Sequence, residues 1–380
     1  MIYSFFPDAD TTLYEGTPGL PDVNMRYTNT GLDEILEVRK IVSSSNTSAT
    51  YISRALVKFD IDFKKVAGGA NWSDVTPKAY LNLYTTEISQ VDSNLAPICH
   101  PVSESWDEGL GRENNLPQTL TGASWINKRG DGATGTAWST GSVGLADDET
   151  PGAVHGGGGT WHNGISSTDE LTTSTKDLRF DATTAVAAWS ESVYHNFGFV
   201  VKMKDVDEST AESYSLKFFS RQTHTIYPPR LEVCWNDKVY NTGSLTELNM
   251  GDTEAVFFYL KNNKGAYKRG SKIRFWSAGR EKYPVKTNGT TSAELAIRHV
   301  PEDKACYSVI DAKTNETVIP YDSTYTALSC DATKGNYFEI YSDSLFEERL
   351  YKLQIRYNSG SAFSPNYSYY DIKDLFKITR

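Results

Sequence analysis

The sequence has few cysteines and methionines and no long apolar run. Its 380 residues include four of each of these two amino acids. The cysteines contain no C-x-x-C pair, which argues against a zinc site, and four thiols in a chain of this length do not form a disulfide scaffold. They are Cys99, Cys234, Cys306 and Cys330, and a pairing of Cys306 with Cys330 stays open. No stretch approaches the ~20 apolar residues of a membrane helix, so we expect no membrane partner.

Positive charge is also scarce. The chain has 38 Lys and Arg residues against 48 Asp and Glu residues, a net charge of −10. Binding to a nucleic-acid backbone needs a basic stripe, so we expect no nucleic-acid partner. The first residues, Met1–Asp8, lack the basic and apolar segments of a signal peptide. We therefore expect a protein that is made in a cytoplasm and released by another route, such as lysis.

Complete catalytic or metal-binding motifs are absent from the sequence. Ala137–Gly141 imitates the nucleophile elbow of a serine hydrolase and His155–Gly159 its oxyanion-hole loop, but the flanking strand and helix are missing and the order is reversed. Asp8 and Asp10 lack the spaced ligands of a calcium loop, and we interpret them as a solvated turn. We predict no enzyme activity, no metal site and no cofactor.

Aromatic residues, by contrast, are abundant. They make up 12% of the chain, and 23 Tyr outnumber 16 Phe. Aromatic and β-branched residues fit half-buried pleated surfaces, which favours sheets. Short runs such as Val57–Ile61 and Leu231–Trp235 alternate with a period of two, the pattern of a strand. The sequence predicts an all-β fold with one short helix after Asp181, whose inner face includes Val186 and Trp189.

Two domains are expected. The first spans residues 1–238 and the second residues 245–380, with Asn241–Ser244 as a linker. About seven strand-like runs follow the linker, the number that fits one immunoglobulin-like sandwich.

Residues 104–176 interrupt the strand pattern of the first domain. This stretch is rich in Gly, Ser, Thr, Asn and Asp, and it cannot form a core of its own. We call it the excursion and interpret it as a long loop that tryptophans pack onto the domain, and as the favoured contact surface. Most tryptophans are expected in the core, but one or two here are expected to be exposed, where they would anchor a protein interface or stack on a sugar. The candidate interface or glycan-contact residues are Trp106, Trp125, Trp138, Trp161 and His162.

Nine fragments in residues 1–236 together carry a family resemblance. They are Pro7–Thr12, Leu36–Arg39, Ser53–Ile61, Ala79–Tyr84, Glu104–Gly109, Phe180–Trp189, Gly198–Val201, Leu216–Arg221 and Pro229–Val233. Their order resembles the DNRLRE-type jelly-roll domain, a β-sandwich found in secreted polysaccharide-binding modules and in phage particle proteins. The resemblance covers roughly three fifths of the chain, and the longer excursion and Gln222, where an acidic residue is usual, depart from the pattern.

The resemblance implies a jelly-roll sandwich with the excursion, followed by the immunoglobulin-like sandwich. It transfers no catalytic residues, and it implies an ion network among Arg54, Asp60 and Arg221. We expect a phage virion structural protein, in the neck, the tail or baseplate, or a capsid-decoration layer. Its partners would be other virion proteins, copies of itself and host-surface polysaccharide, and it would be made in the host cytoplasm. The alternative is a non-catalytic carbohydrate-binding module protein, with an enzyme as a distant third.

Overall fold

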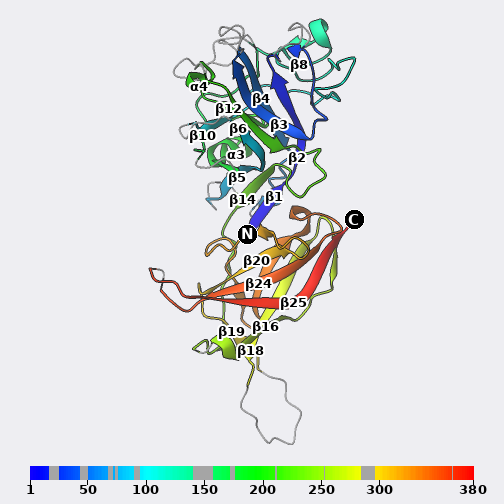
Figure 1. Cartoon of the computed structure of the whole chain (residues 1–380). Helices are drawn as coiled ribbons and strands as arrows, with labels where there is room; N and C mark the ends of the chain where they lie inside the picture. Colours follow the sequence, from blue (N-terminus) through cyan, green and yellow to red (C-terminus); the bar gives the residue numbers. More distant parts are fainter. Residues whose placement is uncertain are drawn as a thin grey trace, which may run out of the picture. The chain divides into compact units, whose positions relative to one another are not determined.

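The computed structural model describes residues 1–16, 25–42, 50–66, 72, 76–89, 95–139, 157–171, 176–209, 212–251, 253–283, 296–361 and 363–380. Within these residues most of the regular secondary structure is β-strand, so the all-β prediction is confirmed (Figure 1). The α-helices that lie wholly within these residues are α3 (Thr183–Ser190) and α4 (Asp205–Ser209). No helix among the described residues is long and apolar enough to cross a membrane.

The chain forms two compact units. The N-terminal unit comprises Phe5–Lys65 and Gly69–Val233, and the C-terminal unit comprises Met1–Ser4, Val66–Gly68 and Cys234–Arg380. The sequence placed Met1–Ser4 and residues 234–238 in the first domain, whereas the structure counts them with the second. The reason is local bonding, because the Met1 amino group donates a hydrogen bond to Tyr325 O and the Ser4 N–H donates to Ser344 Oγ at 3.3 Å. The Met1 amino group also donates to Trp235 O and to Asp237 Oδ1, both at 2.7 Å.

The N-terminal unit is a β-sandwich. Its larger sheet has the order β10-β7-β12-β4-β3-β13-β6, with β2 paired to β4, and its smaller sheet includes β14, β5 and β11 in that order. The strands of the larger sheet are β2 (Pro7–Tyr14), β3 (Ile35–Val42), β4 (Thr50–Phe59), β6 (Thr85–Ser89), β7 (Pro97–Pro101), β10 (Ser167–Thr168), β12 (Phe199–Met203) and β13 (Tyr214–Phe219). The other strands of this unit are β5 (Lys78–Leu83), β8 (Asn127–Arg129), β9 (Thr136–Ala137), β11 (Leu178–Asp181) and β14 (Arg230–Cys234), whereas β1 (Ile2–Phe5) is counted mostly with the C-terminal unit.

The predicted helix is confirmed as α3. The Asp181 carboxylate accepts a hydrogen bond from the Thr183 N–H at 2.9 Å, which satisfies one of the free donors at the helix start. Ala185, Val186 and Trp189 are buried, and the Trp189 ring lies 4.9 Å from the ring of Phe199 on β12. The helix therefore closes the core beside the larger sheet.

The C-terminal unit has the strand order of an immunoglobulin-like sandwich. One sheet contains β16-β18-β23-β22 and the other contains β17-β25-β24-β20-β21. The bounds are β15 (Thr246–Glu247), β16 (Val256–Leu260), β17 (Ala266–Lys268), β18 (Lys272–Glu281), β19 (Arg298–His299), β20 (Ala305–Asp311), β21 (Thr317–Ile319), β22 (Ser329–Asp331), β23 (Gly335–Tyr341), β24 (Leu350–Asn358) and β25 (Tyr367–Thr379). Strands β16 to β18 and β20 to β25 take the places A, A′, B, C, C′, D, E, F and G, with A′ parallel to G.

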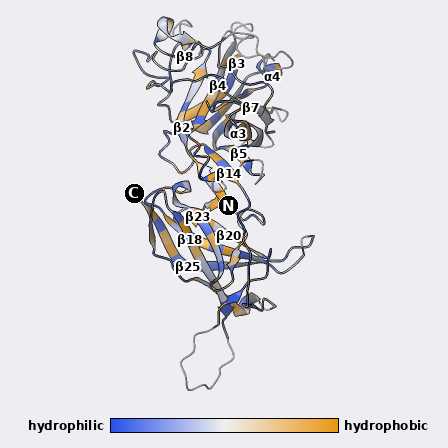
Figure 2. Cartoon of the chain, turned by 180° about the vertical axis from the view of Figure 1, so that it is seen from behind, coloured by the Kyte–Doolittle hydropathy of each residue, from blue (hydrophilic) through white to orange (hydrophobic). Residues whose placement is uncertain are grey.

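Two details support this assignment. Tyr351, at the start of β24, is fully buried, and its hydroxyl donates a hydrogen bond to Phe346 O at 3.1 Å, which is the tyrosine corner of such domains. Strands such as β18 and β25 alternate hydrophobic and hydrophilic residues, as a sandwich requires (Figure 2). The four cysteines are buried and form no disulfide bond, so Cys306 on β20 and Cys330 on β22 are not paired.

Candidate functional site

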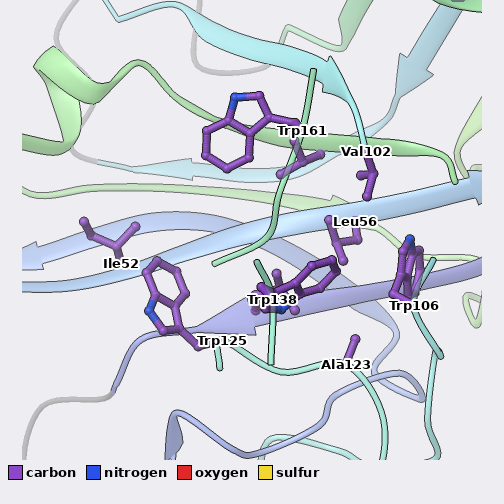
Figure 3. Packing of buried hydrophobic residues seen from close by; sticks show 10 residues of the cluster. Ile52, Leu56, Val102, Trp106, Ala123, Trp125, Trp138 and Trp161 are labelled. Atoms are coloured by element: carbon purple, nitrogen blue, oxygen red, sulfur yellow. The ribbon is translucent and has the colours of Figure 1, made fainter. Parts of the chain in front are cut away.

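The excursion is held on the larger sheet by its four tryptophans. Their side chains are between 0 and 7% exposed, and they form one apolar cluster with side chains of β2, β4 and β12 (Figure 3). The cluster includes Trp106, Trp125, Trp138, Trp161, Leu13, Ile52, Leu56 and Val200. The prediction that one or two of these tryptophans are exposed is wrong, because the rings fill the space between the loop and the sheet.

A buried cation, Arg54 of β4, lies against two of these rings. The guanidinium carbon lies 5.0 Å from the centre of the Trp125 ring and 5.3 Å from that of Trp161. Nε and Nη2 donate to the two carboxylate oxygens of Glu208 in α4, at 3.0 and 2.6 Å. Nη1 donates to Gly158 O at 3.1 Å. Through these hydrogen bonds, Arg54 stabilises the packing of both the excursion and α4 on the sheet.

Gly158 explains part of the glycine run at residues 156–159. Its φ is +85°, and a Cβ there would lie 2.7 Å from Arg54 Nη1 and 2.8 Å from the Trp125 ring. Glycine alone suits both the backbone conformation and the space. His155 and Gly156 of the oxyanion-like fragment lie outside the described residues.

Glu104 is a second residue that stabilises the conformation of the excursion. Its carboxylate accepts hydrogen bonds from Lys128 Nζ at 2.8 Å, from Ser139 N at 2.9 Å and from Thr160 Oγ1 at 3.1 Å. Burial alone would raise the pKa of Glu104, but the hydrogen bonds from Lys128 and Ser139 outweigh it and lower the pKa to about 2. Ser139, the serine of the elbow-like fragment, thus has a structural partner. Residues 140 and 141 of that fragment lie outside the described part.

Three fragments of the family resemblance meet at Asp10 in β2. Its Oδ2 accepts a hydrogen bond from Arg221 N at 2.6 Å, and its own N–H donates to Glu108 Oε1 at 3.1 Å. Arg221 Nε lies 3.0 Å from the same Glu108 oxygen. Burial raises the pKa of Asp10 to about 8, against the opposing hydrogen bond from Arg221. The predicted solvated turn is wrong for Asp10, because this residue pairs with Val57 inside the sheet, whereas Asp8 lies at a bulge.

The predicted ion network takes a different form. Arg54 pairs with Glu208 and Arg221 pairs with Glu108, whereas Asp60 is exposed and belongs to neither pair. All of these contacts stabilise the excursion or the sheet.

His162 is the predicted contact residue that stays near the surface. Its half-buried ring stacks on Tyr194, with ring centres 3.8 Å apart. Burial lowers the pKa of His162, which keeps the ring neutral at physiological pH. Of the five predicted residues, the structure therefore brings four together inside the unit and leaves one half-exposed at its side.

Exposed aromatic side chains gather instead in the C-terminal unit. Among the residues that the structure describes, the exposed Phe, Tyr and Trp side chains are Tyr283 (82%), Phe363 (101%), Tyr367 (43%) and Tyr369 (56%). Tyr283 follows β18, Phe363 lies in the turn between β24 and β25, and the two other tyrosines open β25. We call these four residues the aromatic pole. In immunoglobulin-like domains the B–C and F–G connections lie at this same end.

A cation and a fifth ring order this pole. Arg356 of β24 lies 4.3 Å from the centre of the Tyr367 ring and 4.8 Å from that of Tyr321. The Tyr321 ring meets the Tyr369 ring edge-on, with centres 5.8 Å apart. Cation–π and edge-to-face contacts of this kind limit the rotation of both exposed tyrosines. The pole therefore presents the rings of Tyr367 and Tyr369 in defined positions.

A pocket of about 580 Å³ opens beside the pole, within the C-terminal unit. Its lining includes Glu254, Lys282, Tyr283, Ser368, Tyr369 and Tyr370. This volume lies within the range of small-molecule sites, which is roughly 300–1,000 Å³. The pocket combines aromatic faces with one acid, one base and hydroxyl groups, and its groups can bind a polar ligand by stacking and hydrogen bonding.

Sequence reasoning missed this pole although a signal for it exists. Tyr367, Tyr369 and Asp371 alternate with inward residues of β25, and Ile372, Phe376 and Ile378 farther along the strand are buried. A strand that carries tyrosines on its polar face presents them to solvent. The four tryptophans of the excursion are a stronger sequence pattern than these alternating tyrosines, so the sequence favoured the excursion as the contact surface.

Comparisons with known proteins place the chain in no family. No family model matches the sequence, and no curated protein matches it. Among solved structures, a DUF4785 family protein from Legionella pneumophila is 10% identical with a TM-score of 0.17, and the match covers 80% of this chain and 54% of that one. The β-glucuronidase of Parabacteroides merdae is 8% identical with a TM-score of 0.17, and the match covers 100% of this chain and 36% of that one. This chain thus spans about half and about a third of their lengths, and at such TM-scores neither likeness carries an argument.

Proposed function

We propose that this chain is a structural component of a phage particle that acts by binding and assembly rather than by catalysis. The candidate locations are the neck, the tail or baseplate, and a capsid-decoration layer. The observation that carries the binding role is the aromatic pole, where Tyr367, Tyr369 and Arg356 are held in defined positions at the surface. Tyr and Arg are among the residues that dominate the binding energy of protein interfaces.

The phage assignment is supported by the resemblance of residues 1–236 to the DNRLRE-type domain. Asp10, Glu108 and Arg221 come from three of its nine fragments and contact one another. Their convergence favours a single structural pattern over nine chance matches. On this proposal the N-terminal unit assembles with other virion proteins or with copies of itself, and the C-terminal unit contacts a neighbour or the host surface.

The proposal is tested on purified phage particles. Mass spectrometry of particles from a phage that encodes this chain should detect it at a fixed number of copies per particle. Its absence from particles that contain all the other structural proteins overturns the phage role.

A second measurement tests the assembly step. The double substitution Phe363→Ala with Tyr369→Ala should reduce the amount of chain in particles or the attachment of particles to host cells, while the soluble chain stays folded by circular dichroism. Particles with normal content and normal attachment would show that the pole is not used.

The alternative function is that of a non-catalytic carbohydrate-binding module protein. The observation that favours it is the pocket beside the pole, whose tyrosines and polar groups suit a sugar. A glycan array with the full-length chain tests it. This alternative gains weight if the chain binds a glycan and is absent from particles.

A further inference from the structure

We infer that the pocket beside the aromatic pole is a binding site for a neutral saccharide. The inference rests on the proposed binding role of this pole and names the ligand class that one part of it takes. It moves the candidate sugar site from the tryptophans of the N-terminal unit to tyrosines of the C-terminal unit.

The aromatic walls of the pocket are available and ordered. Tyr283 is mostly exposed at the end of β18, and Tyr369 is held edge-on by Tyr321. Tyr370 is held from inside by Phe258 of β16, with ring centres 4.8 Å apart. A sugar ring has an apolar C–H face that packs on an aromatic ring, and a Tyr also offers a hydroxyl to the sugar edge. Because two of these rings are fixed before binding, little conformational entropy is lost on association.

The polar groups of the pocket match the hydroxyl groups of a sugar. Glu254 supplies a carboxylate that accepts hydrogen bonds, Lys282 supplies an ammonium donor, and the Ser368 hydroxyl both donates and accepts. The backbone of Lys282 is fixed, since its N–H donates to Ala255 O at 2.6 Å, and its Nζ donates to Glu254 O. The accessible surface that lines the pocket is more polar than apolar, which suits the hydroxyl groups of a sugar.

Charge selects a neutral ligand over an acidic one. Glu254 and Lys282 contribute opposite charges, so the pocket lining as described carries no net charge. The whole chain has a net charge of −10, which repels polyanions such as uronate or sulfated polysaccharides. A neutral glycan that contains hexoses is not repelled by the net negative charge of the chain.

The topology gives independent support. The pocket lies where the end of strand B and the start of strand G meet, at the end of the sandwich where the B–C and F–G connections emerge. Asn358 closes the F–G turn, because its side-chain oxygen accepts hydrogen bonds from Gly360 N at 3.0 Å and from Asn366 N at 2.9 Å. This turn carries Phe363, which is fully exposed and does not line the pocket.

The test uses the full-length chain on an array of neutral and acidic glycans, followed by calorimetric titration of the best ligand. Tyr283→Ala and Tyr369→Ala should each weaken binding about fivefold or more, the effect of losing one ring contact. Leu350→Ala and Leu375→Ala are matched controls, because both side chains are exposed on β24 and β25 outside the aromatic pole and the pocket lining, and these variants should bind the sugar as the wild type does. Glu254→Gln should weaken binding about tenfold, the usual loss for a charged hydrogen bond.

Each outcome of this test is informative. A neutral glycan lost in the pocket variants and kept in the controls supports the inference. Binding of acidic glycans alone, binding that the pocket variants leave unchanged, or no binding to any glycan overturns it. If particles contain the chain but no sugar binds, the phage role stands and the saccharide site falls. If sugar binds and particles lack the chain, the reverse holds.

Discussion

Each unit packs an arginine against two aromatic rings, but the arginine and rings are buried in one unit and lie at the surface in the other. In the N-terminal unit Arg54 lies between Trp125 and Trp161, and all three are almost fully enclosed. In the C-terminal unit Arg356 lies between Tyr321 and Tyr367 at the surface. The contact distances are similar, so the chemistry of the arginine and the rings does not decide the role. Solvent exposure decides the role of the arginine and its rings. A buried contact of this kind stabilises the fold, whereas an exposed one leaves the outer faces of the rings accessible to a partner.

The same difference explains why a high number of tryptophans in the excursion does not identify a contact surface. A long polar loop has no core of its own and needs large apolar side chains to dock on the sheet. The four tryptophans of the excursion supply this apolar surface, and Glu104 and Arg54 supply polar fastenings. A strand of a sandwich has a core already, so tyrosines on its outward face are not needed for folding. We therefore expect substitutions in the two places to separate stability from binding.

The largest effect should come from Trp125→Ala. The ring is fully buried against the sheet and against Arg54, and removing a buried Trp costs about 3–5 kcal/mol. The free energy of unfolding from urea titrations should fall by that amount. Most tryptophans of the chain lie in the N-terminal unit, so intrinsic fluorescence reports on this unit. A loss below about 1 kcal/mol would show that the excursion does not depend on the cluster.

The next effect should come from Glu208→Gln. This change leaves the Arg54 guanidinium buried without its carboxylate, which costs about 3 kcal/mol. The double variant Arg54→Met with Glu208→Leu removes both charges and should be more stable than Glu208→Gln alone. Unfolding free energies of the single and double variants measure the coupling. Additive losses would contradict a pair that acts as one buried unit.

An effect that depends on pH is expected from Asp10→Asn. Burial raises the pKa of Asp10 to about 8 from its ordinary 3.8, so between these values the folded state holds a proton that the unfolded state releases. The stability from this group is full below about pH 4 and is lost as pH rises to about 8. Because Asn does not titrate, the unfolding free energy of the variant relative to the wild type should rise with pH by up to roughly 1.4 kcal/mol per pH unit.

The control for this pH effect is Asp8→Asn, since Asp8 lies at the bulge of β2 and is exposed. Urea titrations at several pH values from 5 to 8 should show no such trend for it. Parallel curves for Asp10→Asn and the wild type would contradict an inward, protonated carboxyl group.

The smallest effect on stability should come from Tyr369→Ala. Its ring is more than half exposed, and substitutions at exposed positions usually change stability by no more than about 0.5 kcal/mol. The same variant should weaken saccharide binding about fivefold or more, whereas Trp125→Ala should affect stability more than binding. A loss of stability as large as that of the tryptophan variant would remove the distinction between the two clusters.

Much of the fold could be predicted from the sequence, and less of the surface. The alternation around Val57 and Leu231 predicts strands, and the residues that follow Asp181 predict the helix, because these patterns are local. The partners of Asp10 could not be predicted in the same way. Glu108 and Arg221 lie about 100 and 200 residues away, and only the packing of the sheets brings them to the same carboxylate.

The sequence by itself thus determined the all-β class, since a period of two is a local pattern. It also indicated the immunoglobulin-like second unit from about seven runs, although the structure forms more strands than that. Tertiary structure alone decided which aromatic residues are covered. An aromatic residue among polar residues in the sequence is compatible with two roles. It can pack a loop onto a sheet or contact a partner at the surface, and only its solvent exposure in the folded chain distinguishes the two. For this chain it places the tryptophans of the excursion inside and Tyr367 and Tyr369 of β25 outside.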